Sequence, residues 1–255
     1  MYDVVCDEPI FGACNGRIES NFGMTKADSN VDRIYEKLRK MAADFEFKPD
    51  TRINESALST VLGASRTPLR EALNRLVAEG FLTFQSGRGF FCRPLSPKLI
   101  LDLYEARVAI ETEIVRLVCR RASDKQLQDL MEFLKSTEPD YDSCEDPMEL
   151  LNMDEAYHMR IAALSQSNEL VRILENLNDR VRYIRLVDLK CLRGKTPVST
   201  QEEAQLSAHR VVLTALINRD EDKAVSTMRH HIERRRDEAT EAVRIAYSQL
   251  YVPAD

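Results

Sequence analysis

Apolar residues between positions 54 and 80 recur every three or four positions, which is the spacing of one face of an α-helix. Two such stripes occur, separated by a glycine. The first predicts a short helix that begins at Asn54, an N-cap residue type, and ends at Gly63 in the manner of a C′ glycine. Its apolar face consists of Ala57, Leu58, Val61 and Leu62.

The second stripe follows almost at once and predicts a longer helix. Ser65 or Thr67 can cap it, and Pro68 suits its first turn because a proline there loses no intrahelical hydrogen bond. The pattern ends at Gly80. The apolar face of this helix consists of Leu69, Ala72, Leu73, Leu76 and Val77.

Residues 81–85 and 89–93 read as two strands that flank Ser86-Gly87-Arg88, a three-residue hairpin loop. The glycine of this loop can adopt the left-handed conformation, and Arg88 would project from the tip. Helix, tight turn, helix and hairpin together form the outline of a winged helix-turn-helix, which indicates DNA binding.

Because the apolar face of the second helix packs inward, Arg66, Thr67 and Arg70 remain outward at its N-terminal end. Side chains at this place in a helix-turn-helix meet base edges, and the amide dipole there favours phosphate. The candidate DNA-binding residues are Ser65, Arg66, Thr67, Arg70, Ser86, Gly87 and Arg88.

Caps and breakers divide the rest of the chain. Residues 1–27 hold three glycines and no sustained period, so we expect a flexible tail, and a first helix follows from Val31 to Phe45. Ser96-Pro97 marks a boundary, since it places an N-cap residue before a proline at the first helical position. Beyond it we expect an antiparallel bundle with loops at 137–146 and 193–200. Its helices are predicted at 97–122, 124–136 (capping box Ser123 and Gln126), 147–165 (cap Asp146), 168–192, 201–218 (cap Thr200) and 221–248.

Charge is unevenly distributed along the 255 residues. The net formal charge is −3 over residues 1–30, +3 over 31–95 and −6 over 96–255. A nucleic-acid module should be the positive part of a chain, because neutralising phosphates and releasing counterions supplies much of the affinity. Among its cations, Arg66, Arg70, Arg75 and Arg88 are clustered rather than spread along the segment.

The composition, 44% hydrophobic and 31% charged, is ordinary for a soluble globular protein. No run of about eighteen apolar residues is present, and the N-terminus carries acids where a signal peptide would need cations, so we expect a cytoplasmic protein without a membrane span. The six cysteines include no C-x-x-C pair, which favours reduced thiols over a disulfide framework or a cysteine zinc site.

Three of the four histidines fall on inward helical stripes. Asp154 and His158, one turn apart, share a face with aliphatic residues; His209 and His231 lie on similar stripes of two later helices, whereas His230 points elsewhere. Singly, an inward histidine usually just hydrogen-bonds. Together, three imidazoles and a carboxylate form a set suited to a divalent ion, zinc above all, with nickel, manganese or iron also possible.

The segment 62–82, Leu-Gly-Ala-Ser-Arg-Thr-Pro-Leu-Arg-Glu-Ala-Leu-Asn-Arg-Leu-Val-Ala-Glu-Gly-Phe-Leu, resembles the DNA-binding domain of the GntR family of bacterial transcription regulators. Residues 103–111, Leu-Tyr-Glu-Ala-Arg-Val-Ala-Ile-Glu, resemble the start of the helical effector domain, called FCD, of its FadR-type branch. The resemblance implies a mainly α protein, in which residues 28–95 form a winged helix-turn-helix with a small β-hairpin and residues 96–255 form an antiparallel helical bundle for effector binding and dimerisation. Asp154, His158, His209 and His231 match the metal-binding subset of FCD domains.

Two interpretations of Arg107 remain open. It can form an exposed ion pair with Glu111, four residues on, worth a few tenths of a kcal/mol. The resemblance implies instead that Arg107 points into the bundle and binds the carboxylate of an effector, for which its forked donors are suited.

The function implied is that of a DNA-binding regulator controlled by a small carboxylate metabolite at a metal-containing pocket, acting as a homodimer on a double-stranded, pseudo-palindromic operator. The alternative is a metal-responsive regulator in which the ion itself is the signal. A metal-dependent hydrolase would use the same ligand set, but the sequence offers no separate candidate base and no Gly-rich phosphate loop, so we do not expect an enzyme.

Overall fold

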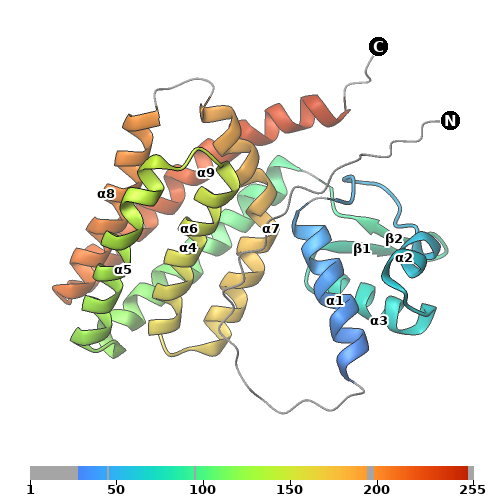
Figure 1. Ribbon diagram of the computed structural model, residues 1–255, viewed down its shortest axis with the longest axis horizontal. Coiled ribbons are helices and arrows are strands. Elements are labelled where there is room, and N and C mark those ends of the chain that lie inside the picture. Colours follow the sequence, from blue (N-terminus) through green and yellow to red (C-terminus); the bar gives the residue numbers. More distant parts are fainter. Residues whose placement is uncertain (1–27, 45, 95, 194–197, 252–255) are drawn as a thin grey trace.

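The computed structural model describes residues 28–44, 46–94, 96–193 and 198–251 (Figure 1). The predicted tail, residues 1–27, and the position of Phe45 lie outside this range. The chain folds into a small N-terminal unit beside a larger helical bundle. The elements of the N-terminal unit are α1 (Asp28–Ala43), α2 (Glu55–Leu62), α3 (Arg66–Ala78), β1 (Leu82–Gln85) and β2 (Gly89–Cys92).

The N-terminal unit confirms the predicted winged helix-turn-helix. Asn54 caps α2 by accepting a hydrogen bond from the amide of Ala57, and Gly63 ends α2 in the left-handed conformation at φ 60°. The two strands pair antiparallel around the loop at 86–88, with Leu82 opposite Cys92, and Gly87 has φ 72°. Apolar residues of α1, α2, α3 and the hairpin form one core.

The first apolar stripe was predicted too wide. Val61 is 74% exposed, whereas Leu58 and Leu62, one turn apart, are buried. Because α2 has only eight residues and packs along a narrow strip of α3, one pair of leucines satisfies that contact. Single exposed apolar residues are normal on protein surfaces.

The larger unit is a helical bundle with its own core, in which α4 packs against α9 and α7, α6 against α7, and α5 against α8. Ser96 and Asp146 cap their helices as predicted, and Ser123 with Gln126 forms the predicted capping box. None of the helices in the described ranges is long and apolar enough to span a membrane. The helices are α4 (Pro97–Arg121), α5 (Asp124–Ser143), α6 (Pro147–Leu164), α7 (Asn168–Arg193), α8 (Val198–Ile217) and α9 (Glu221–Tyr251).

Three boundaries of the bundle differ from the sequence prediction by three residues or more, among them the end of α9, which continues past position 248 to Tyr251. Most of the loop expected at 137–146 is helical, since α5 continues through Pro139 to Ser143. Tyr141 is 4% exposed, so its burial favours continuing the helix past the proline. Helix α8 begins at Val198, so Thr200 lies within the helix and is not its cap. Of the loop expected at 193–200, residues 194–197 lie outside the described range.

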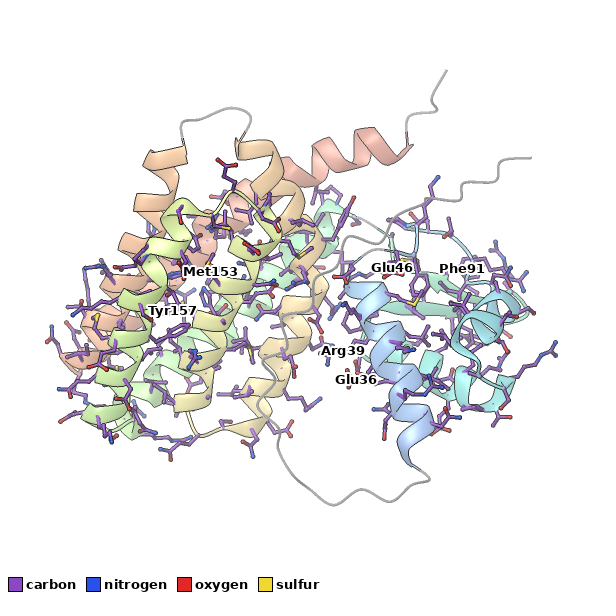
Figure 2. The ribbon with its side chains drawn as sticks, in the orientation of Figure 1. Glu36, Arg39, Glu46, Phe91, Met153 and Tyr157 are labelled. Atoms are coloured by element: carbon purple, nitrogen blue, oxygen red, sulfur yellow. The ribbon has the colours of Figure 1, made fainter. Side chains whose placement is uncertain are left out.

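Helix α7 joins the two units. Glu36 and Arg39 lie on the side of α1 that faces the bundle (Figure 2). Gly80, which has φ 80°, packs so closely on α7 that a Cβ atom there would lie 2.9 Å from the guanidinium of Arg180. Polar contacts between the described residues of the two units include Arg39 Nη2 to Asp179 Oδ2 at 2.9 Å, Asn176 Nδ2 to the Glu79 carbonyl at 3.2 Å, Arg93 Nη2 to the Arg180 carbonyl at 2.6 Å, and Arg182 Nε to Asp44 Oδ1 at 3.7 Å.

Candidate metal centre and nucleic-acid interface

Asp154, His158, His209 and His231 meet inside the bundle. They come from α6, α8 and α9, all four are buried, and one ligand atom of each lies within 4.8 Å of the others. The Nε2 atom of His158 is 3.3 Å from that of His231, and His209 Nε2 is 3.4 Å from Asp154 Oδ1. His230 is exposed, as its helical phase predicted.

The protonation states of this cluster suit a cation. Burial lowers the pKa of His209 and takes that of His231 well below its ordinary value, so both rings are neutral near pH 7. Burial opposes ionisation of Asp154, but the Arg185 guanidinium and the neighbouring imidazoles outweigh it and hold its pKa well below the usual range. Neutral imidazoles and an ionised carboxylate are the forms that bind metal.

The hydrogen bonding of the rings also leaves room for an ion. Glu111 accepts from Nδ1 of His158, so Nε2, the ring nitrogen that faces His231, is the one placed to bind a metal. The Nε2 atom of His209 is buried and faces Asp154 Oδ1 at 3.4 Å without a hydrogen bond of good geometry to a described residue. Nitrogen lone pairs that converge on one point with a carboxylate are what a divalent ion requires.

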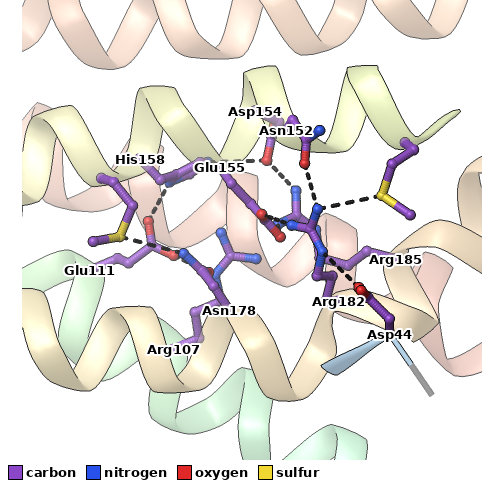
Figure 3. A network of polar contacts seen from close by, with 12 residues as sticks. Asp44, Arg107, Glu111, Asn152, Asp154, Glu155, His158, Asn178, Arg182 and Arg185 are labelled. Atoms are coloured by element: carbon purple, nitrogen blue, oxygen red, sulfur yellow. Dashed lines mark hydrogen bonds and ion pairs between the residues drawn. The ribbon is translucent and has the colours of Figure 1, made fainter. Parts of the chain in front are cut away.

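Two residues that the sequence analysis did not assign to the cluster hold the histidines in place. The Glu111 carboxylate accepts hydrogen bonds from the His158 ring and from Nε of Arg107, as the close-up shows (Figure 3). Tyr157 donates to the carbonyl of His209 at 2.8 Å, and the two rings lie 4.2 Å apart between centroids. Carboxylates that accept from the second nitrogen of a ligating histidine fix its tautomer and orientation.

Arg107 points into the bundle, so the interpretation of its pair with Glu111 as an exposed surface ion pair is wrong. The residue is 1% exposed, and the ion pair with Glu111 exists but is buried. Nη2 of Arg107 has no hydrogen-bond partner within the described ranges. The guanidinium of Arg107 therefore lies buried beside the four clustered residues with one N–H donor unused.

The predicted DNA-binding residues are all exposed on the N-terminal unit. Ser65, Arg66 and Thr67 begin α3 in the open, and the Ser65 side chain makes no capping hydrogen bond with a described residue. Ser86, Gly87 and Arg88 are exposed at the tip of the hairpin.

The contacts of three arginines, Arg70, Arg75 and Arg52, refine this assignment. Arg70 is paired with Glu55 at 3.0 Å, which orients its guanidinium, and Arg75 belongs to the packing of α1, since it pairs with Asp32 at 2.6 Å. Arg52 was not singled out in the sequence, yet it lines a surface hollow of about 520 Å³ together with Arg66 and Arg70. The sequence could have indicated Arg52 by its position just before α2, the first helix of the helix-turn-helix.

The fold and the two sites define a class of protein: a winged helix-turn-helix DNA-binding unit joined to a helical domain with a buried polar site. Comparison with known proteins gives the family. The bacterial regulatory proteins of the gntR family match residues 30–92, and the FCD domain matches residues 102–234.

Relatives of known class cover most of the chain. The Nta operon transcriptional regulator of Aminobacter aminovorans is 37% identical over 211 residues, which are 83% of this chain and 95% of the relative. The HTH-type transcriptional repressor GlaR of Escherichia coli (strain K12) is 28% identical over 73% of this chain and 84% of its own length. The structure of E. coli McbR/YncC shares the fold, with a TM-score of 0.64, 21% identity, and coverage of 87% of this chain and 98% of that one.

The chain therefore belongs to the GntR family of transcriptional regulators and carries an FCD domain. This family consists of regulators rather than enzymes, and its helix-turn-helix implies DNA binding.

Proposed function

We propose that operator binding by this regulator is controlled by a small organic acid bound at a divalent metal ion inside the FCD domain. The observation that carries the proposal is the convergence of Asp154, His158, His209 and His231 within 4.8 Å in a buried site. Three imidazoles and one carboxylate suit zinc best, and also nickel, manganese or iron. When bound, the ion would supply open coordination positions that a carboxylate can fill.

Arg107 would hold the same acid from its other side. Its buried Nη2 has no partner among the described residues, and its Nε is held by Glu111, so the fork is already oriented. A metal ion and a guanidinium side by side would concentrate positive charge in a buried region. An anion bound between them neutralises that charge, so the site favours anionic ligands.

Residues 28–95 would form the DNA-binding unit of this regulator. Arg66 is exposed at the start of α3 and would read a base edge, with guanine the preferred partner of arginine. Arg70 and Arg88 would contact phosphate or the groove walls. The hydroxyls of Ser65 and Thr67 would bind phosphate at the helix N-terminus, while Ser86 and Gly87 let the wing approach the backbone.

Residues 96–255 would bind the effector and dimerise. A single recognition helix reads only a few base pairs, so we propose a homodimer that binds a pseudo-palindromic operator with one winged helix per half-site. Sedimentation with an operator duplex tests this, since one chain per duplex would exclude it.

The experiment that tests the control mechanism compares operator affinity of the metal-free protein, the zinc-loaded protein, and the zinc-loaded protein with each of a panel of small carboxylic acids. A change that requires both zinc and an acid supports the proposal. A full change with zinc alone supports the alternative, a metal-responsive regulator, which the same four buried ligands also favour. Unchanged affinity in every arm, despite bound zinc, would exclude both.

A further inference from the structure

Helix α7 contacts both the helix that carries two of the candidate ligands and the DNA-binding unit. Arg182 lies where the two contacts meet. Its guanidinium reaches Glu155 and Asn152 on α6 and, through Nε, Asp44 Oδ1 at 3.7 Å. Asp44 directly follows the last residue of α1, at the negative end of that helix dipole, so a cation from α7 stabilises this end.

The ion pairs around Arg182 continue to the candidate metal ligand (Figure 3). Asp154 pairs through Oδ2 with Arg185, and Nη1 of Arg185 lies 3.6 Å from Glu155 Oε1. Glu155 then pairs through Oε2 with Arg182, which reaches Asp44. Five groups of alternating sign thus connect the metal-centred cluster to the DNA-binding unit.

The burial of the middle members makes this series electrostatically effective. The side chains of Arg185, Glu155 and Arg182 are 8%, 16% and 17% exposed. Charges at this depth are screened much less than surface charges, so a change at one member alters the balance at the next. Glu155 pairs with both Arg182 and Arg185. A stronger ion pair with one arginine therefore weakens its ion pair with the other.

We infer that this ion-pair series, running from Asp154 through Arg185, Glu155 and Arg182 to Asp44, couples occupancy of the metal site to docking of the DNA-binding unit on α7; the inference rests on the proposed metal site. A cation bound to Asp154 competes with Arg185 for its carboxylate. Arg185 then turns toward Glu155, whose hold on Arg182 weakens. Arg182 is released toward Asp44, and the C-terminal end of α1 is held more firmly.

Hydrogen exchange on the full-length chain tests this coupling in metal-free and zinc-loaded forms. The variant is Arg182→Gln, and the matched control is Arg172→Gln, which removes an exposed ion pair with Glu169 from the same helix. Elemental analysis first establishes zinc content for all three proteins. Zinc should slow exchange of the backbone amides at positions 41–44 by about two- to fivefold in wild type and Arg172→Gln, the range that one ion pair contributes.

In Arg182→Gln the zinc-dependent slowing should disappear while zinc content stays that of wild type. If the wild-type protein binds zinc but exchange at these amides is unchanged or faster, the coupling is wrong and the proposed metal site is still supported. Persistence of the slowing in Arg182→Gln also overturns it. Wild type that binds no zinc overturns the proposed metal site itself, and the coupling with it.

Discussion

Replacing Glu111 by glutamine tests whether one carboxylate supports both halves of the effector site. Glu111 accepts from His158 Nδ1 and from Arg107 Nε, and it is 1% exposed. Glutamine keeps the shape and removes the charge. Its amide can accept from one of these donors, while its own N–H group opposes the other.

The substitution should lower both the stability of the protein and its affinity for metal, and each effect has its own expected size. Breaking a buried ion pair by removing one partner costs about 3–5 kcal/mol, because Arg107 stays buried without its countercharge. For an effector domain of this size that lowers the melting temperature by roughly 6 to 20 °C. Loss of the carboxylate behind a ligating histidine also weakens metal binding by about 10- to 100-fold.

Thermal unfolding of the metal-free proteins and zinc titration against a competing chelator measure the two effects. Glu113→Gln is the matched control, since Glu113 lies on the same helix and pairs with Arg116 at the surface. That variant should bind zinc like wild type and melt within a few degrees of it. If Glu111→Gln matches Glu113→Gln in both measurements, the support assigned to Glu111 is wrong.

Three further predictions concern single sites. Arg66→Ala should remove about 1–3 kcal/mol of preference for the operator over random DNA in binding assays, whereas Arg88→Ala should weaken both alike; an unchanged specificity ratio in Arg66→Ala would refute the base contact. His209→Ala should lose the metal and the rise of melting temperature with zinc, and His230→Ala should keep both; loss of metal from His230→Ala would contradict the assignment. Burial raises the pKa of Cys92 to about 11, so its reaction with a disulfide reagent at pH 8 should be at least about 100-fold slower than in urea and should accelerate with pH. Stability from this buried thiol is present below pH 9 and is lost as pH rises toward 11, which urea unfolding across that range would detect.

Helical phase placed each member of the candidate metal cluster on an inward face, and the resemblance to metal-binding FCD domains singled the four out as one ligand set. Asp154 and His158 are four residues apart, and each of His209 and His231 shares a stripe with buried apolar residues, so the bundle had to bring them inward. Phase also separated His230 from His231. What periodicity could not supply is which buried groups from different helices meet.

The partners of these ligands illustrate that limit. Glu111 and His158 are 47 positions apart, and Arg185 reaches Asp154 across 31. Such pairings depend on the relative rotation and shift of packed helices, which a single sequence does not encode locally. The length of α5 was missed for a related reason, because burial of Tyr141 against other helices outweighs a local proline signal.

The close approach of Gly80 to Arg180 has a consequence for the engineering of chimeric regulators. Any side chain at position 80 would meet both a guanidinium at 2.9 Å and a backbone at φ 80°, which glycine alone adopts readily. A DNA-binding unit grafted from another regulator therefore docks with the least rearrangement when it keeps glycine here, since any other residue strains the backbone and displaces the Arg180 side chain. Grafts that keep a glycine after the recognition helix and an acid at the end of the first helix are the ones expected to respond to ligand.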